Sequence, residues 1–274
     1  MDTLNVRGCQ LSLYQQDCLE GLKQHVATES IQVAVTSPPY NLNTPYTVYR
    51  DNLKRKQYCV WLVDVLLEMG RTLAPEGSLF LNLGSKPTDP WGPMEVLFAL
   101  RNHEKNPFRL QNTFHWVKAI SMGRDTPVKG HTKPINSNRF VADQHEYVFH
   151  LTKTGKTTLY REAFGVGVPY ADSSNLTRGT RGRNGNVRDQ GNTWFIPYKT
   201  INNRALDRPH PATFPVELPL RCLRIAGAKK GDTVLDPFMG LATTAEAALV
   251  METNFIGFEL DGSYYEHAKA KFQQ

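Results

Sequence analysis

Cysteine is scarce in this sequence and is not spaced for metal or disulfide chemistry. The 274 residues include four cysteines, and no two of them form a Cys-x-x-Cys pair. Structural zinc sites and disulfide frameworks rely on such spacings, so the sequence predicts neither a metal site nor a disulfide. Reduced thiols are typical of the cytosol, and a cytoplasmic protein is what we expect.

Long apolar runs and a full dinucleotide fingerprint are also missing. No segment reaches the roughly 18 apolar residues of a membrane span, and the N-terminus lacks the basic-then-apolar pattern of a secretory signal. We therefore expect no membrane association. The strand–turn segments lack a complete Gly-x-Gly-x-x-Gly, which disfavours a nicotinamide-dependent dehydrogenase.

Negative charge is scarce in one region, residues 151–210. This region holds ten Lys and Arg against four Asp and Glu, an excess equal to the net charge of +6 of the whole chain. Within it, residues 171–193 contain only three aliphatic side chains and cannot form a core of their own. A long basic loop is either functional or a solvated surface segment, and a polyanion partner is one explanation of its charge.

Outside that region, segments with strand and helix patterns alternate along the chain. This alternation predicts βαβ units and a mostly parallel sheet of about seven strands in a single domain covering residues 1–274. The predicted strands are residues 10–14, 31–35, 78–84, 112–118, 145–153, 232–238 and 254–260. The predicted helices are residues 17–25, 55–73, 214–227, 241–251 and 263–272.

A rigid polar and aromatic tip follows the strand predicted at residues 31–35. The chain continues as Thr36-Ser37-Pro38-Pro39-Tyr40, and neither proline can donate a hydrogen bond to a sheet. The tip therefore presents the Ser37 hydroxyl, the Pro38 carbonyl and the Tyr40 ring at the end of a strand. Open α/β sheets bind their ligands at such carboxyl ends. A rigid turn that only caps the strand is the structural alternative.

A second strand–turn–helix segment, VLDPFMGLATT, covers residues 234–244. Asp236 ends the strand, and Gly240 lies in a turn whose backbone amides and helix start can face a ligand. Glu259 follows Gly240 by 19 residues at the end of the next strand, where an acid suits a ribose diol. One glycine is weak evidence, because a simple packing glycine would give the same pattern.

Together, Ser-Pro-Pro-Tyr and Asp-Pro-Phe-x-Gly in this order resemble the S-adenosylmethionine-dependent amino DNA methyltransferases of the circularly permuted beta class. The resemblance covers nearly the whole chain and includes Asp17-Cys18 in DCLEGL and His210 in HPATFP. It implies a Rossmann-like fold with an inserted target-recognition region at residues 155–205. It departs from the family at Ala242, where a second glycine is usual, and this puts cofactor affinity in question.

The resemblance also implies roles for individual residues. It assigns catalysis to Ser37, Pro38, Pro39 and Tyr40, with Tyr40 stacking on a flipped base. The cofactor-binding residues that it implies are Asp17, Cys18, His210, Asp236, Phe238, Gly240, Thr243 and Glu259. The arginines expected to contact DNA are Arg178, Arg181, Arg183 and Arg188. No metal is needed, because the sulfonium is already an activated leaving group.

The expected activity is methylation of cytosine N4 in double-stranded DNA, because a serine at position 37 favours cytosine in this family. Adenine N6 is the first alternative, and RNA or a protein amide is a more remote acceptor. A non-catalytic DNA-binding protein on the same scaffold is the alternative of another class, with Ala242 in its favour. Such enzymes commonly protect DNA from a separate restriction endonuclease, and the chain itself contains nothing that resembles a nuclease. The sequence leaves open whether the protein is a monomer or a homodimer.

Overall fold

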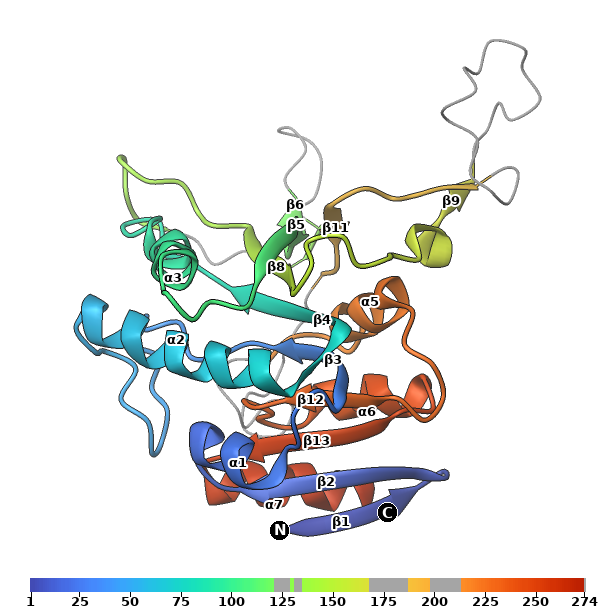
Figure 1. The fold of residues 1–274 in the computed structure, drawn as a ribbon. Helices are drawn as coiled ribbons and strands as arrows, with labels where there is room; N and C mark the ends of the chain where they lie inside the picture. The colour runs from blue at the N-terminus through green and yellow to red at the C-terminus, as the bar shows by residue number, and fades with distance from the viewer. Residues whose placement is uncertain (121–128, 131–134, 168–186, 198–212, 274) are drawn as a thin grey trace, which may run out of the picture.

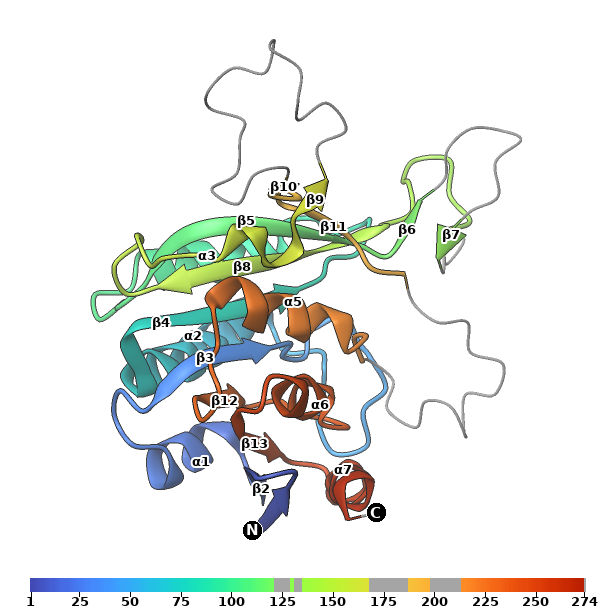
Figure 2. The same ribbon diagram turned by 90° about the vertical axis from the view of Figure 1, so that its right-hand side faces the viewer.

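A computed structural model describes residues 1–120, 129–130, 135–167, 187–197 and 213–273. A central sheet separates two layers of helices (Figure 1). Helices α1, α2 and α3 cover one face, and α5, α6 and α7 cover the other. The two termini lie near each other beside the β1 end of the sheet (Figure 2). No helix in the described ranges is long and apolar enough to cross a membrane.

Among the described residues the central sheet has nine strands, in the order β1-β2-β13-β12-β3-β4-β8-β5-β11. Most neighbours pair in parallel, whereas β1 is antiparallel to β2 and β8 is antiparallel to both β4 and β5. The strands are β1 (Asp2–Val6), β2 (Cys9–Gln15), β3 (Ile31–Thr36), β4 (Leu73–Leu83), β5 (Arg109–Val117), β8 (His145–Thr152), β11 (Thr193–Phe195), β12 (Thr233–Asp236) and β13 (Asn254–Glu259).

The prediction of a mostly parallel α/β sheet is confirmed, but its number of about seven strands is too low. The two additional strands, β1 and β11, form the two edges of the sheet. Only alternate residues of β1 are sheltered and none is fully buried, and β11 has three residues. Edge strands bury one face or pair along one side only, so they need no continuous apolar run and leave little trace in the sequence.

The helices are amphipathic and bury one side each against the sheet. In α5, for example, Leu218, Cys222 and Ile225 are buried at spacings of four and three residues, as one helical face requires. The helices are α1 (Cys18–His25), α2 (Arg55–Thr72), α3 (Gly92–Arg101), α5 (Glu217–Ala226), α6 (Thr243–Val250) and α7 (Gly262–Phe272). The five predicted helices are all present, and α3 is an addition.

Short elements complete the described fold on the side of β5 and β11. They are β6 (Ala119–Ile120), β7 (Lys129–Gly130), η1 (Arg161–Phe164), β9 (Val166–Gly167) and β10 (Val187–Arg188). Two of them, β9 and β10, pair as a separate two-stranded ribbon. These elements lie at the end of the sheet farthest from the termini (Figure 2).

The strand order reverses between β3 and β12, and this places the site. From β3 the chain continues through α2 to β4 on one side, while from β12 it continues through α6 to β13 on the other. The two strands are parallel neighbours, with Val234 opposite Val33 and Leu235 opposite Ala34. Their carboxyl ends therefore open a crevice at a topological switch point, where open α/β sheets bind ligands.

Part of the predicted recognition region, residues 155–205, belongs to the core of the sheet. Trp194 on β11 is 2% exposed, and its ring stacks on Phe114 at 4.3 Å between centroids. The Trp194 ring packs inside the protein and β11 is an edge strand of the central sheet, while the recognition role of residues 155–205 stays a prediction.

Replacing Trp194 tests whether β11 contributes to the stability of the whole domain. We expect Trp194→Ala to lower the free energy of unfolding by about 3–5 kcal/mol, because it removes a large buried ring and leaves a cavity. Urea denaturation measures the change. Trp91→Ala is the matched control, since Trp91 is 65% exposed and its loss should change stability by less than about 0.5 kcal/mol. Equal effects of the two substitutions would contradict this placement of β11.

Candidate active site

One open cleft lies at the carboxyl ends of β3 and β12. It encloses about 1240 Å³, solvent at its mouth included, and both sequence motifs line it. Ser37, Pro38, Pro39 and Tyr40 form one side, and the turn from Pro237 to Leu241 forms another. Ligands bound at the two motifs would therefore lie in one cleft.

The Ser-Pro-Pro-Tyr tip is held by contacts from both sides. Pro38 is buried, and the Pro39 carbonyl accepts a hydrogen bond of 2.8 Å from the Tyr58 hydroxyl of α2. Beyond the tip, the Asp51 carboxylate accepts hydrogen bonds from three backbone amides of residues 41–44. The tip is therefore rigid both through its prolines and through its neighbours.

Tyr40 is anchored at its hydroxyl as well as at its ring. The hydroxyl donates to Glu146 Oε2 at 2.8 Å and lies 2.7 Å from Ser37 Oγ. The ring lies directly over Gly84, where an added Cβ would come within 2.8 Å of it. Gly84 thus lets Tyr40 approach the sheet. The role of the ring in stacking on a base stays a prediction.

The Asp236 carboxylate lies beneath the cleft rather than on its surface. Asp236 is 1% exposed, and both carboxylate oxygens accept hydrogen bonds from the protein. Oδ1 accepts from Thr36 Oγ1 at 2.7 Å and from the Phe238 amide at 3.1 Å, and Oδ2 accepts from Thr244 Oγ1 at 2.6 Å. Burial raises the pKa of Asp236 to about 6, and the three donors partly offset this effect. Asp236 supports the turn through these contacts, and its expected contact with the cofactor stays a prediction.

The turn after β12 requires left-handed backbone at two positions. Gly240 has φ +51°, and Ala242 has φ +57° with ψ +41°. An alanine in this region costs about 1–2 kcal/mol relative to its ordinary conformations, which is the physical reason why glycine suits position 242. Here the alanine adopts the turn geometry all the same, and its methyl group is fully buried in the core. Burial of a methyl group offsets part of the strain.

Glu259 faces the cleft across from this turn. Its Oε2 accepts from the Gly240 amide at 2.9 Å, and its Oε1 accepts from the Asp261 amide at 2.8 Å. Burial raises the pKa of Glu259, while these two amides act in the opposite direction. Each carboxylate oxygen has a second lone pair, so Glu259 retains acceptor capacity for hydroxyl groups of a ligand.

Six of the eight expected cofactor residues lie together in the lining of this cleft. They are Asp17, Cys18, Phe238, Gly240, Thr243 and Glu259. Asp17 also caps α1, since its Oδ1 accepts from the amides of Leu19 and Glu20. Asp236 lies behind the turn, and His210 is outside the described residues.

The expected DNA contacts fall mostly outside the described part of the chain. Arg178, Arg181 and Arg183 are not described. Arg188 is in β10, where its backbone pairs with Val166. Their contacts with DNA therefore stay predictions.

An aromatic wall that the sequence did not predict closes another side of the cleft. Trp61 of α2 lines the cleft, stacked on Tyr49 at 5.6 Å and edge-on to Phe238 at 5.7 Å. Tyr46 follows at 6.2 Å from Tyr49. Burial raises the pKa of Tyr49 to about 12. Three of these four rings come from one loop and one helix, so only the fold brings them to Phe238.

The loop that carries Tyr46 and Tyr49 also reaches the far side of the cleft. The Thr47 hydroxyl donates to Asp261 Oδ2, and Asp261 caps α7 through its Oδ1. Residues 44–50 thus lie across the cleft between the two motifs. Within the described residues no group of three or more His, Cys, Asp or Glu side chains could hold a metal ion.

The raised pKa of Asp236 makes a prediction about stability and pH. In the unfolded chain an aspartate has a pKa of about 3.9, so the folded state binds the proton more tightly, and stability from this group grows as the pH falls through 6. We expect the free energy of unfolding of the wild type, relative to Asp236→Asn, to rise by about 1 kcal/mol between pH 7.5 and pH 5. Urea denaturation at both pH values measures this difference, and a difference that is the same at both would contradict the raised pKa.

Comparisons with known proteins agree with this geometry. Residues 31–270 match the family model N6_N4_Mtase, described as DNA methylase. The type II methyltransferase M.BglII of Bacillus subtilis is 25% identical over 93% of this chain and 67% of its own length. M.Cfr9I of Citrobacter freundii is 26% identical over 96% of this chain and 87% of its own.

Solved structures show the same fold. The PvuII DNA methyltransferase (cytosine-N4-specific) superposes with a TM-score of 0.70 at 22% identity, covering 96% of this chain and 86% of that one. A putative DNA modification methylase from Thermus thermophilus, complexed with S-adenosyl-L-methionine, has a TM-score of 0.60 at 23% identity, covering 95% and 92%. Since the family model matches most of its length, the chain belongs to the N6/N4 DNA methylase family and is a DNA methyltransferase.

Proposed function

We propose that this protein methylates the N4 amine of cytosine at specific sites in double-stranded DNA, with S-adenosylmethionine as methyl donor. The observation that carries the proposal is the meeting of Ser37-Pro38 and the Gly240–Glu259 pair in one cleft. A direct methyl transfer requires a site for the methyl donor and a site for the accepting amine in the same cleft.

The residues of the cleft fit the donor. S-adenosylmethionine supplies an electrophilic methyl group on a sulfonium. Glu259 would accept from the ribose hydroxyls through its remaining lone pairs. Phe238 and Trp61 offer apolar faces for a purine ring, and Asp17 lies at the same edge of the cleft. Asp236 also supports this arrangement, because it joins the ends of β3 and β12. It would thereby set the distance between the methyl donor and the accepting amine.

The tip of β3 would activate the amine. The lone pair of an exocyclic amine is delocalised into the base, which makes the nitrogen a poor nucleophile. Acceptor atoms that receive hydrogen bonds from the two amine N–H groups favour localisation of that lone pair on the nitrogen. They also stabilise the positive charge that develops on the amine during transfer. The Pro38 carbonyl and Ser37 Oγ are the acceptors that the rigid tip presents. Because they are already oriented, little reorganisation is needed at the moment of reaction.

The amine of a paired base is not accessible inside a duplex, so the target base would be flipped into the cleft. Tyr40 would support the flipped base with its ring, while its hydroxyl stays anchored to Glu146. The predicted recognition region, residues 155–205, would read the flanking sequence, with Arg178, Arg181, Arg183 and Arg188 contacting phosphates or base edges. Action on chromosomal DNA would require the protein in the cytoplasm.

Adenine N6 is the second candidate for the methylated position. A relative named DNA adenine methyltransferase YhdJ, from Escherichia coli, is 23% identical over 90% of this chain. Ser37 favours cytosine, because the family that the sequence resembles links a serine at this position to cytosine N4 and an aspartate or asparagine to adenine N6. The cytosine-N4-specific PvuII enzyme also supports cytosine. The type II relatives support a role beside a separate restriction endonuclease.

The product identifies the reaction. We expect purified protein, incubated with plasmid or genomic DNA and isotope-labelled S-adenosylmethionine, to produce labelled N4-methylcytosine in a nucleoside digest analysed by mass spectrometry. Labelled N6-methyladenine instead would keep the mechanism and overturn the choice of base. Absence of any labelled base with several genomic DNAs, with the cofactor nevertheless bound, would contradict methylation of DNA and leave RNA as the acceptor to be assayed.

Cofactor binding tests Glu259 without any acceptor. We expect Glu259→Gln to weaken binding of S-adenosylmethionine by at least about tenfold in calorimetry. An amide cannot accept at both positions, so either the Gly240 or the Asp261 amide loses its partner at a cost of about 1–3 kcal/mol. Glu266→Gln on the exposed side of α7 is the matched control. If both variants bind the cofactor as the wild type does, Glu259 does not hold it.

A further inference from the structure

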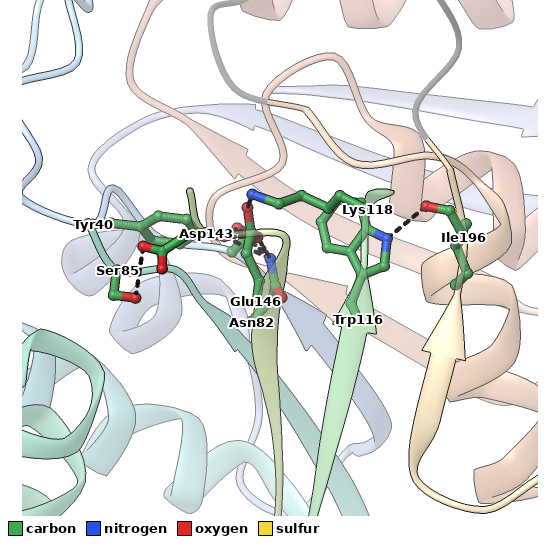
Figure 3. A network of polar contacts seen from close by, with 9 residues as sticks. Tyr40, Asn82, Ser85, Trp116, Lys118, Asp143, Glu146 and Ile196 are labelled. Atoms are coloured by element: carbon green, nitrogen blue, oxygen red, sulfur yellow. Dashed lines mark hydrogen bonds and ion pairs between the residues drawn. The ribbon is translucent and has the colours of Figure 1, made fainter. Parts of the chain in front are cut away.

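A buried polar network connects the Ser-Pro-Pro-Tyr tip to β4 and β8, two strands that carry neither sequence motif. Glu146 on β8 is 8% exposed and lies at its centre (Figure 3). Its Oε2 accepts from the Tyr40 hydroxyl at 2.8 Å and from Asn82 Nδ2 at 2.7 Å, and its Oε1 accepts from Lys118 Nζ at 2.9 Å. Glu146, Asn82 and Tyr40 all line the cleft.

The chemistry of these groups determines which atom donates in each contact. An ionised carboxylate has no proton and can only accept. Tyr40 has a single hydroxyl proton, and its hydrogen bond to Glu146 uses it. The contact of 2.7 Å between Tyr40 and Ser37 therefore needs the proton of Ser37. The chain of hydrogen bonds runs from Ser37 to Tyr40 to Glu146.

This direction decides what Ser37 presents to a base. With its proton turned towards Tyr40, Ser37 Oγ accepts from Asn82 Nδ2 at 3.3 Å and keeps its second lone pair for the cleft. In the opposite direction, Tyr40 would donate to Ser37, and the serine proton would point at the amine whose protons the site has to accept. A donor at that position competes for the nitrogen lone pair that attacks the methyl group.

We propose that Glu146 is a positioning residue that sets the direction of this chain, so that Ser37 acts as a hydrogen-bond acceptor for the target amine. The inference rests on the proposed function of the same cleft. Glu146 itself does not need to touch the base, since it acts through Tyr40 and Ser37. Lys118 holds the carboxylate through a charge-assisted hydrogen bond.

Asn82 provides independent support, because the same carboxylate orients its amide. Nδ2 donates to Glu146 and lies 2.5 Å from the Tyr40 hydroxyl oxygen. Its Oδ1 is buried and has no hydrogen-bond partner among the described residues. Such an unpaired acceptor is unfavourable by about 1–3 kcal/mol. A flipped amide would place Oδ1 against the carboxylate oxygen, so the observed orientation indicates that Glu146 dominates the network.

Glu146→Gln removes the charge that fixes the direction of the chain while keeping the shape of the side chain. Lys118 has donors only, so it attracts the new amide oxygen, and the amide nitrogen then faces Tyr40 and Asn82 Nδ2. Tyr40 becomes an acceptor at that contact, so its proton is no longer held by the carboxylate and is shared between Ser37 and an Asn82 amide that can turn its oxygen towards Tyr40. We expect kcat for DNA methylation to fall by about 100-fold, comparable to the loss of one preorganised polar contact to a transition state. The Kd for S-adenosylmethionine should stay within about threefold of the wild type, since the cofactor side of the cleft is unchanged.

A second substitution distinguishes direction from mere support. In Lys118→Met/Glu146→Gln the competing donor is gone, so the amide oxygen can turn back to Tyr40 and Asn82. We expect this double variant to be about tenfold or more faster in kcat than Glu146→Gln alone. Lys118→Met alone keeps the carboxylate and should lose less activity than Glu146→Gln. Asp143→Asn, just before β8 and outside the network around Tyr40, is the matched control for the loss of an acidic side chain.

The Asn82 side-chain amide reports the direction without any turnover. In ¹⁵N-asparagine-labelled protein, its protons should be shifted downfield by the carboxylate in the wild type, lose this shift in Glu146→Gln and recover part of it in the double variant. A double variant no faster than Glu146→Gln, or an amide that is the same in all three proteins, would overturn the inference. If the wild type methylates no nucleic acid, the proposed function fails, and the amide spectrum still decides the direction of the network.

Discussion

The site depends on one buried carboxylate, Asp236, and on the three donors that surround it. Thr36 belongs to the strand that carries the catalytic tip, the Phe238 amide belongs to the turn, and Thr244 belongs to the first turn of α6. A carboxylate without solvent is stable only where donors satisfy it. The carboxylate therefore holds the ends of β3 and β12 and the start of α6 in one arrangement, and the donor and acceptor halves of the cleft keep their separation. The raised pKa of Asp236 reflects the free energy needed to bury this charge.

Acidic side chains around the cleft differ in function because they differ in their donors. Asp17 and Asp261 cap helices with one oxygen each. Glu259 is satisfied by two backbone amides and retains lone pairs towards the cleft. Glu146 is surrounded by side-chain donors, which places it at the end of a hydrogen-bond chain rather than in contact with a bound ligand. The residue type alone does not distinguish these functions, whereas the geometry of the donors does.

Much of the fold could be predicted from the sequence, because buried strands and amphipathic helices have strong periodic patterns. The seven predicted strands and five predicted helices are all present. The edge strands β1 and β11 were not predicted, because β1 is half-exposed and β11 has only three residues. Within the site, the two motifs and their meeting at the carboxyl ends of neighbouring strands were predicted, and six of the residues expected to bind the cofactor line the cleft. The places of Trp61, Asn82 and Glu146 in the site were not predicted. Each belongs to an ordinary helix or strand pattern, and its part in the cleft depends on which other element packs beside it.

The sequence by itself determined the chemistry: a stiff Ser-Pro-Pro-Tyr tip, a glycine turn after a strand, and the order in which they occur. These depend on backbone restrictions of proline and glycine, which act over a few residues. Only the tertiary structure decided that Asp236 supports the turn, that Trp194 packs in the core, and that Glu146 meets Tyr40 across 106 residues. The physical reason is that a hydrogen bond or a stacked ring requires a specific approach of two groups, and for groups far apart in the chain only the packing of the sheet provides it.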